Sequence, residues 1–292
     1  MFAGTFTALV TPFQNDEVDE AAFARLIEAQ IEAGITGIVP VGTTGESPTV
    51  DHEEHNRVIG LAVKIANGRC KVIGGTGSNS TREAVSLTVE AARLGCDAAL
   101  SVAPYYNRPS PEGLYRHFAE IAKASELPIV LYSIPARCGI EIGVETVVRL
   151  ARDFPTIVAI KESGGSVERV SALRAALPPE FEILSGDDSL TLPFMAAGAV
   201  GVISVASNLI PREVGDLVRA ALGGDYEEAR RLHLHWYPLF KDLFLDPNPV
   251  PIKYALSLLG RMHPDVRLPL CEISSATAAK LEASLRKLNI LR

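Results

Sequence analysis

The chain has 292 residues, of which 28 are basic and 35 acidic, so its formal net charge is −7. An acidic balance argues against binding to nucleic acid, which requires basic side chains, and against attachment to a membrane through a polybasic patch. Four cysteines without a CxxC pair, no apolar run of the roughly 18 residues that span a bilayer, and no secretion signal together predict a cytoplasmic protein with reduced thiols.

Short apolar runs alternate with amphipathic stretches from the N-terminus to about residue 210. The apolar runs are continuous rather than alternating, which is typical of strands covered on both faces. The predicted strands are residues 5–10, 37–41, 71–74, 98–102, 129–133, 157–161, 182–185 and 201–205. The predicted helices between them are residues 19–33, 51–66, 81–94, 111–125, 144–152, 167–176 and 189–197. Eight such units predict an α/β fold, a closed (β/α)8 TIM barrel.

Three of the predicted helices begin at residues typical of N-caps. Asp51 with Glu54, and Ser80 with Glu83, have the spacing of a capping box. Ser110 is followed by a proline, which predicts an N-cap with proline at the first helical position.

After residue 210 the strand pattern stops. Helical patterns follow at residues 213–222, 226–244, 251–259 and 275–288, and the loop Asp246-Pro-Asn-Pro-Val-Pro251 precedes the third of them. No flexible linker separates this part from the preceding units. We therefore predict a catalytic barrel domain over residues 1–210 and a C-terminal helical extension over residues 211–292 that packs on the barrel.

Polar residues at the C-terminal ends of the predicted strands are the candidates for catalysis, because the active site of a (β/α)8 barrel lies at that face. These candidates are Thr43, Thr44, Glu46, Tyr105, Tyr106, Tyr132, Lys161, the stretch from Gly186 to Asp188, and Ser204. They include neither histidine nor cysteine, and no convergent carboxylates that would hold a divalent metal. The set argues against metal-assisted hydrolysis and predicts no metal ion.

Lys161 is the most informative candidate because it ends the apolar run Thr156-Ile-Val-Ala-Ile-Lys161. Its amine would emerge near the barrel axis, where burial favours the neutral form, and a neutral amine can attack a ketone to form a Schiff base. The alternative is an ordinary strand-end lysine that reaches solvent or pairs with Glu162. For a lysine considered alone, the alternative is the commoner case.

Other candidates also allow two interpretations. The loop Gly42-Thr-Thr-Gly-Glu-Ser47 could hold a carboxylate or phosphate on its N–H groups, or could be a turn that needs glycine only for its conformation. Tyr106 and Tyr132 could relay protons or satisfy one buried hydrogen bond. Arg137 could bind a substrate carboxylate or lie at the surface. The segment His52-Glu-Glu-His55 differs from the HExxH zinc motif in its spacing, and we interpret it as an exposed helix face.

Several motifs occur together in the order and spacing of one enzyme family. They are Gly42-Thr-Thr-Gly-Glu-Ser47, Pro104-Tyr-Tyr-Asn-Arg-Pro109, Tyr132-x-x-Pro135-x-Arg137, Ile160-Lys-Glu162 and Ser185-Gly-Asp-Asp188. Ala8-Leu-Val-Thr-Pro-Phe13, Gly201-Val-Ile-Ser-Val205 and Asn248-Pro-Val-Pro-Ile-Lys253 extend the match over essentially the whole chain. The chain resembles the dihydrodipicolinate synthase family of the pyruvate-dependent class I aldolases and lyases, and this resemblance favours the catalytic interpretation of Lys161.

The resemblance implies a reaction between two small anions. Lys161 would condense with pyruvate, and the resulting enamine would attack the aldehyde of L-aspartate 4-semialdehyde to give 4-hydroxy-tetrahydrodipicolinate in lysine and diaminopimelate biosynthesis. Thr43 and Thr44 would hold the pyruvate carboxylate, and Arg137 would meet the carboxylate of the semialdehyde. Since the covalent imine is the electron sink, no cofactor is expected.

The same resemblance implies further contacts and an oligomer. Tyr132 would transfer protons, with Thr44 linking it to Tyr106, and the family takes that relay tyrosine from a neighbouring subunit. A homotetramer built as a dimer of dimers is therefore expected. Gly186 and Ile203 would lie beside the substrate.

A second set of residues matches the L-lysine feedback site of regulated family members. This set is Ser47, His52, His55, Asn79, Glu83 and Tyr105. Glu83 also fits a simple capping box. We expect L-lysine to inhibit the enzyme.

Sister activities are the main alternative. Ser133 departs from the family pattern, which has asparagine after the strand-end tyrosine, and this stretch is similar to that of 4-hydroxy-2-oxoglutarate aldolases. N-acetylneuraminate lyases share the Schiff-base lysine and the tyrosine. Arg137 favours the synthase, because the sister enzymes generally lack arginine there. A barrel that had lost catalysis would be expected to lack Lys161, Tyr132 or Thr44, and all three are present.

Overall fold

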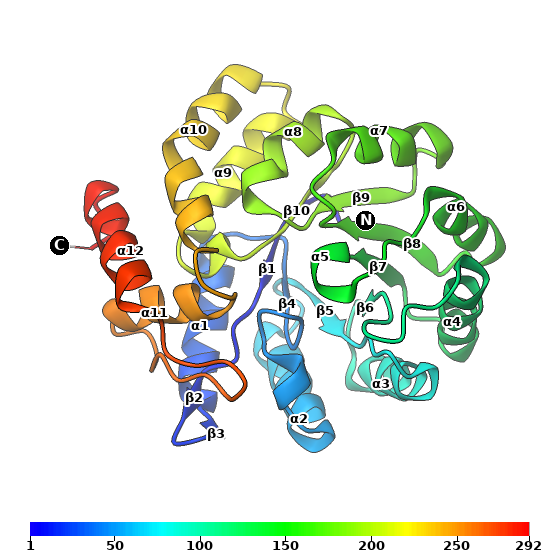
Figure 1. Cartoon of the computed structure of the whole chain (residues 1–292), viewed down its shortest axis with the longest axis horizontal. Coiled ribbons are helices and arrows are strands. Elements are labelled where there is room, and N and C mark those ends of the chain that lie inside the picture. The colour runs from blue at the N-terminus through cyan, green and yellow to red at the C-terminus, as the bar shows by residue number, and fades with distance from the viewer. Residues whose placement is uncertain (292) are drawn as a thin grey trace.

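A computed structural model describes residues 1–291 and contains a closed barrel of eight parallel strands (Figure 1). The strands are β1 (Gly4–Ala8), β4 (Gly37–Val39), β5 (Lys71–Gly75), β6 (Ala98–Val102), β7 (Ile129–Ser133), β8 (Ile157–Glu162), β9 (Glu182–Ser185) and β10 (Gly201–Ser204). Each pairs with its neighbour in the chain, and β1 pairs with both β4 and β10 to close the ring. The predicted TIM barrel is confirmed, and each predicted strand lies within two residues of the observed one.

Helices cover the outside of this barrel. They are α1 (Glu20–Glu32), α2 (His52–Ala66), α3 (Thr81–Leu94), α4 (Pro111–Ala124), α6 (Val144–Asp153), α7 (Val167–Ala176), α8 (Thr191–Ala196) and α9 (Pro211–Leu222). Helix α9 contacts β1 and β10, so it occupies the position of the eighth barrel helix. The expected division after residue 210 falls just before α9, which contacts both the barrel strands and α10.

Three further helices form the C-terminal part, which lies to one side of the barrel mouth beside α1 and α9 (Figure 1). They are α10 (Tyr226–Asp242), α11 (Val250–Leu258) and α12 (Ser275–Lys287). Helix α10 packs against α9 and α12, and α11 packs against α12. The predicted helical extension packed on the barrel is therefore present.

Short elements were missed because they are too brief to show a periodic pattern. Strands β2 (Phe13–Gln14) and β3 (Glu17–Val18) form a hairpin whose two turn residues, Asn15 and Asp16, both have positive φ angles, 53° and 65°. Helix α5 (Pro135–Cys138) is a single turn after β7. It carries Arg137, so this missed element places a predicted site residue.

Two of the three predicted caps are confirmed. Asp51 and Glu54 form a complete capping box at α2, and the Ser110 side chain accepts a hydrogen bond from the third residue of α4. The prediction for Ser80 is wrong, because its side chain caps nothing. The carboxylate of Glu83 accepts instead from the hydroxyl of Ser78, which outcompetes the expected contact with the backbone.

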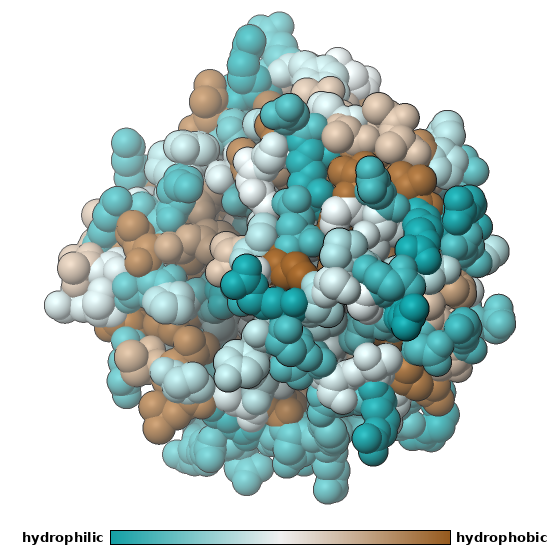
Figure 2. Space-filling view, turned by 45° about the vertical axis from the view of Figure 1, so that its right-hand side comes forward, coloured by the Kyte–Doolittle hydropathy of each residue, from teal (hydrophilic) through white to brown (hydrophobic). Residues whose placement is uncertain are grey.

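Side chains of the strands fill the barrel as a packed core. Its buried members include Phe6, Val39, Ile73, Leu100, Val130, Tyr132, Ala159, Leu184 and Ile203. Phe2 closes this cluster and is 1% exposed. On the outer face, polar side chains interrupt the apolar patches (Figure 2). Within residues 1–291, no helix combines the length and hydropathy that crossing a bilayer requires.

Candidate active site

Lys161 and Tyr132 lie side by side at the C-terminal ends of neighbouring strands. The two residues are paired in register between β7 and β8, so their side chains leave the sheet on the same face. Tyr132 belongs to the cluster inside the barrel, and Lys161 is only 5% exposed. Its Nζ lies 4.2 Å from the centroid of the Tyr132 ring. The structure therefore brings the predicted nucleophile and the predicted proton carrier together inside the barrel mouth.

Glu162 is turned away from the lysine and held by Arg169. The Nε of Arg169 donates to Glu162 Oε2 at 2.9 Å, and the N–H of Gly164 donates to Oε1 at 2.6 Å. Burial raises the pKa of Glu162, and the guanidinium opposes that shift. The alternative pairing of Lys161 with Glu162 is therefore wrong, and among residues 1–291 the Lys161 amine has no carboxylate partner.

Gly186 leaves the space that the lysine side chain occupies. A methyl group in place of its hydrogen would lie 2.9 Å from Cε of Lys161 and 1.9 Å from Oγ of Ser163. Both distances are shorter than van der Waals contact. Glycine at this position therefore leaves the lysine room to extend past β9.

The loop that follows β4 has an unusual backbone. Val41 has a φ angle of 52° and Glu46 one of 57°, although a β-branched residue rarely adopts a positive φ. The N–H groups of Gly45, Glu46 and Ser47 bond within the loop. Those of Thr43 and Thr44 meet no acceptor among the residues described. Two free N–H groups in a rigid turn are suited to an anion such as a carboxylate.

Asn248 joins Thr44 to Arg137. Its Nδ2 donates to Thr44 Oγ1 at 3.0 Å, and its backbone oxygen accepts from the Arg137 guanidinium at 3.2 Å. Because the Thr44 oxygen already accepts one hydrogen bond, its own proton is available for another acceptor. Arg137 itself is exposed at the mouth, with guanidinium donors left for a ligand.

Tyr106 is not part of this assembly within one chain. Its side chain is 91% exposed and its φ angle is 70°. The expected link from Tyr132 through Thr44 to Tyr106 is absent from the described residues of a single copy. Ile203, by contrast, is 1% exposed and lines the barrel interior on β10.

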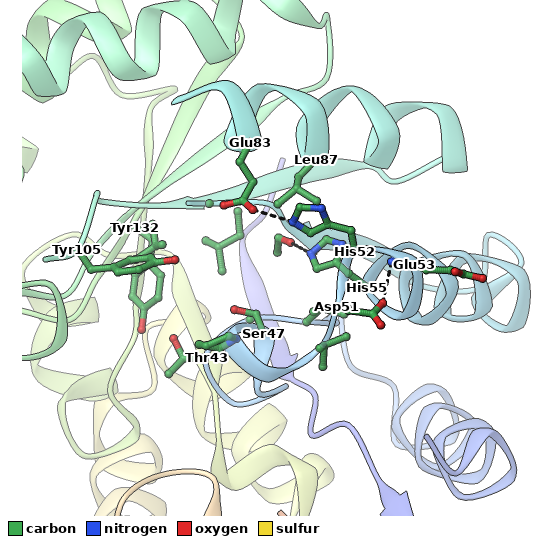
Figure 3. Close-up of a pocket in the computed structure, with 18 residues that line it drawn as sticks. Thr43, Ser47, Asp51, His52, Glu53, His55, Glu83, Leu87, Tyr105 and Tyr132 are labelled. Carbon is green, nitrogen blue, oxygen red and sulfur yellow. Dashed lines mark hydrogen bonds and ion pairs between the residues drawn. The ribbon is translucent and has the colours of Figure 1, made fainter. Parts of the chain in front are cut away.

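A cavity of about 630 Å³ opens beside the barrel mouth (Figure 3). Thr43 and Tyr132 line it, and the Tyr132 ring centroid lies 4.2 Å from Nζ of Lys161. His52, His55, Glu83, Ser47 and Tyr105 also line it, on α2, on α3 and on the loops after β4 and β6. Five of the six residues expected to bind L-lysine thus surround one space. Asn79 is not among its lining residues, and its backbone oxygen accepts from Asn107.

The two histidines of this cavity differ in environment. His55 is 4% exposed and its Nε2 lies 2.8 Å from the backbone oxygen of Gly75, so its interpretation as part of an exposed helix face is wrong. Burial lowers the pKa of His55 and favours the neutral ring. His52 is exposed, and its Nε2 lies 2.7 Å from Glu83 Oε1. The Ser78 hydroxyl, aided by His52, lowers the pKa of Glu83 and keeps that carboxylate charged.

No group of three or more histidine, cysteine, aspartate or glutamate side chains in residues 1–291 is arranged to hold a metal ion. The structure adds functional neighbours that sequence reasoning did not assign. Asn248 and Lys253 lie in a motif that was recognised without a role. Arg169 carried no signal, because an arginine in the first turn of a helix is usually a surface residue. The proline-rich context of Asn248 was the one available indication that its loop has a fixed shape.

Comparison with known proteins places the chain in a large group. The model of the family described as "Dihydrodipicolinate synthetase family" matches residues 1–288. A 4-hydroxy-tetrahydrodipicolinate synthase of Hydrogenobaculum sp. is 50% identical, with all of both chains covered.

Solved structures agree with this placement. The 4-hydroxy-tetrahydrodipicolinate synthase of Methylacidiphilum fumariolicum SolV is 55% identical with a TM-score of 0.98, covering 99% of this chain and 96% of that one. A synthase of Cyanidioschyzon merolae with lysine bound is 41% identical with a TM-score of 0.96, covering 99% of both chains.

Proposed function

The chain belongs to the dihydrodipicolinate synthetase family, and from that premise we infer that it condenses pyruvate with L-aspartate 4-semialdehyde as a 4-hydroxy-tetrahydrodipicolinate synthase. This is a lyase activity of lysine and diaminopimelate biosynthesis. The observation that carries it is a buried lysine at the end of β8 whose neighbouring carboxylate is bound elsewhere. The relatives described above are synthases, which favours this activity over the sister aldolase and lyase reactions.

The first step is imine formation at Lys161. The neutral amine attacks the ketone carbon of pyruvate, and loss of water gives the imine. Tyr132, whose ring lies against the amine, is placed to carry the protons that leave nitrogen and reach the departing oxygen. The free N–H groups of Thr43 and Thr44 hold the pyruvate carboxylate.

The second step forms a carbon–carbon bond. Withdrawal of electrons by the imine lets a methyl proton pass to Tyr132. The enamine carbon then attacks the aldehyde of the semialdehyde, and the aldehyde oxygen takes up that proton to become the hydroxyl group. Arg137 binds the carboxylate of that substrate. The semialdehyde nitrogen then attacks the imine carbon, which closes the ring and frees Lys161. Because the imine supplies the electron sink, the reaction proceeds with neither a metal nor an organic cofactor.

A second copy of the chain completes the proton relay. Tyr106 is almost fully exposed in one chain and stands on a loop with positive φ angles. Burial against a neighbouring subunit would place it near Thr44, within a dimer that pairs into a tetramer. Sedimentation velocity tests this arrangement, since a fully active monomer would contradict the shared site.

L-lysine is the regulator that the cavity fits best. The charged Glu83 carboxylate is suited to an ammonium group, while His52 and Ser47 offer hydrogen bonds at the same wall. The lysine-bound relative favours this proposal. Activity that stays flat across millimolar L-lysine, with a normal response to both substrates, would remove it.

Borohydride reduction in the presence of pyruvate tests the mechanism directly. Reduction fixes the imine, so a peptide containing Lys161 gains the mass of pyruvate less one water plus two hydrogens. The peptide that contains Lys253, a second buried lysine, serves as the internal control and stays unlabelled. A label on Lys253 or on no lysine would overturn the assignment of the nucleophile.

Substrate choice is tested by a coupled assay. Turnover of pyruvate with aspartate semialdehyde should exceed turnover of 4-hydroxy-2-oxoglutarate or a sialic acid. In Arg137→Ala, the loss of a charged hydrogen bond should weaken use of the semialdehyde by about tenfold or more while borohydride trapping of pyruvate continues. Equal losses in both steps would contradict the role of Arg137.

A further inference from the structure

The loop between Val41 and Ser47 is strained and must be held in place. Val41 is buried with a φ angle of 52°, a conformation that persists in a β-branched residue only where its surroundings enforce it. Gly45 and Gly75 pack directly on its backbone. A methyl group on Gly75 would lie 2.3 Å from the Val41 oxygen, and one on Gly45 would lie 2.9 Å from the Val41 Cα.

The strongest tie on this loop comes from the C-terminal part of the chain. Nζ of Lys253, in α11, lies 2.5 Å from Oε1 of Glu46. The two side chains are 0% and 1% exposed. Breaking such a pair is costly because either charge would be left buried without a partner. The Lys253 amine also lies 4.3 Å from the centroid of the Phe13 ring, which shields it from water.

Two neighbouring contacts act on the same loop. The backbone N–H of Arg267 donates to the second oxygen of Glu46 at 3.0 Å, so both oxygens of that carboxylate are engaged. Asn248, five residues before Lys253, donates to the Thr44 hydroxyl. On the barrel side, the Thr11 hydroxyl donates to the Gly45 oxygen at 2.7 Å. The loop is thus tied at Thr44, Gly45 and Glu46, while the N–H of Thr43 meets no acceptor among residues 1–291.

We propose that Lys253 is a positioning residue for substrate binding: its buried pair with Glu46 holds the loop so that the N–H groups of Thr43 and Thr44 stay free for the substrate carboxylate. The C-terminal part therefore acts on the active site through α11. The proposal rests on the proposed function for the identity of the substrate. The part of the proposal that concerns the shape of the loop can be tested without measuring activity.

The test compares two ways of disturbing the C-terminal part. The double variant Glu46→Gln with Lys253→Met removes both charges, so neither is left unpaired and the protein can fold. We expect its KM for pyruvate to rise roughly tenfold with a smaller change in kcat, because ground-state binding of the carboxylate is lost. Asn248→Ala, a milder change, should raise the same KM by a smaller factor.

Asp242→Asn is the matched control. Asp242 is 4% exposed and accepts from Ser284 and Lys280, so the change loosens α10 and α12 without touching the loop. It should lower the melting temperature and leave the KM for pyruvate unchanged. If Asp242→Asn raised that KM as much as the double variant does, general loosening would explain the effect and the proposal would be wrong.

Hydrogen exchange gives a readout that does not require catalysis. The amides of Gly45, Glu46 and Ser47 bond to oxygens of Gly42 and Thr43, so they should exchange faster in the double variant than in the wild type or in Asp242→Asn. Wild-type exchange and a wild-type KM in the double variant would overturn the proposal. Absence of imine formation in the wild type would instead overturn the proposed function, and the exchange result would still decide the role of Lys253.

Discussion

Two buried lysines of this chain have opposite surroundings. Lys161 in β8 and Lys253 in α11 are 5% and 0% exposed, and each amine lies a little over 4 Å from the centroid of an aromatic ring. Lys253 is paired with Glu46, whereas the carboxylate next to Lys161 is held by Arg169. Burial lowers the pKa of Lys253, and Glu46 opposes that shift.

The difference teaches that burial alone does not make a lysine a nucleophile. A carboxylate partner fixes the amine as an ammonium and uses it for structure. An amine without such a partner is left for contact with a ligand, as the proposed imine formation at Lys161 requires. In this protein Glu162 follows Lys161 directly in β8, so its side chain leaves the opposite face of the sheet, where Arg169 binds it at 2.9 Å.

Replacing Lys161 should give the largest effect of all. Lys161→Met removes the nucleophile, and we expect kcat to fall by more than about a thousandfold. The melting temperature should stay the same or rise, because a buried amine that pairs with no carboxylate in the described part of the chain is replaced by an apolar side chain of similar length. Steady-state kinetics and thermal unfolding check the two halves of this prediction. A large loss of stability would contradict the contrast between the lysines.

Replacing Lys253 alone should instead have its main effect on stability. Lys253→Met leaves the Glu46 carboxylate buried and unpaired, which should cost about 3–5 kcal/mol of unfolding free energy. Urea unfolding measures this cost, and adding Glu46→Gln should recover part of it. A loss below about 1 kcal/mol would mean that the pair stabilises the fold no more than a surface ion pair does.

Gly186→Ala sharpens the comparison by disturbing Lys161 without changing its charge. The new methyl group would lie 2.9 Å from Cε of Lys161, so the amine must move. Because misplacement of a reacting group by about 1 Å can cost roughly a hundredfold, we expect a loss of that size in the rate of imine formation. Gly143→Ala is the control, since its nearest neighbour would be 4.0 Å away. Equal rates in the two variants would refute the steric role of Gly186.

His117 is a third buried basic side chain, and it tests how burial without a carboxylate partner affects stability rather than catalysis. Its expected effect is the smallest of the four. His117 is 5% exposed, its Nδ1 lies 2.9 Å from the Thr81 hydroxyl, and burial lowers its pKa to about 4. A histidine whose folded pKa is depressed stabilises the protein above its unfolded pKa of about 6.5, and this contribution is lost as the pH falls towards 4.

Linkage then gives the size of the effect. At pH 5 the native state should be about 2 kcal/mol less stable through this group than at pH 8. Urea unfolding at both pH values measures the difference, and His117→Gln, which cannot titrate, should reduce it. An unchanged pH dependence in that variant would assign the effect to other groups.

Sequence reasoning predicted the barrel because each of its elements carries a local signal. The strands are apolar runs bounded by turns, and the helices are amphipathic, so element type could be predicted without knowing any contact. The capping box at Asp51 was predicted correctly for the same reason, since its partners are three residues apart. Ser80 failed because a competing hydroxyl on Ser78 could not be seen in the pattern.

The same distinction between local signals and distant contacts applies to the candidate site. Lys161, Tyr132 and Thr44 could be identified as candidates because they lie at or just after the ends of predicted strands. The local pattern shows where a strand ends, and in a barrel the active site lies at the C-terminal ends of the strands. The sequence did not determine which polar side chains are in contact. Asn248 lies 204 residues from Thr44, and Lys253 lies 207 residues from Glu46.

From its sequence alone, this chain was predictable as an α/β barrel with a strand-end lysine and a family resemblance. The tertiary structure decided that Lys161 has no carboxylate partner among residues 1–291, that Lys253 is paired, and that five expected regulatory residues line one cavity. The physical reason is the separation along the chain of the residues that interact. Helix and strand patterns arise from neighbours along the chain, whereas the partner of a buried charge is set by contacts that exist only after the barrel and the C-terminal helices have packed together.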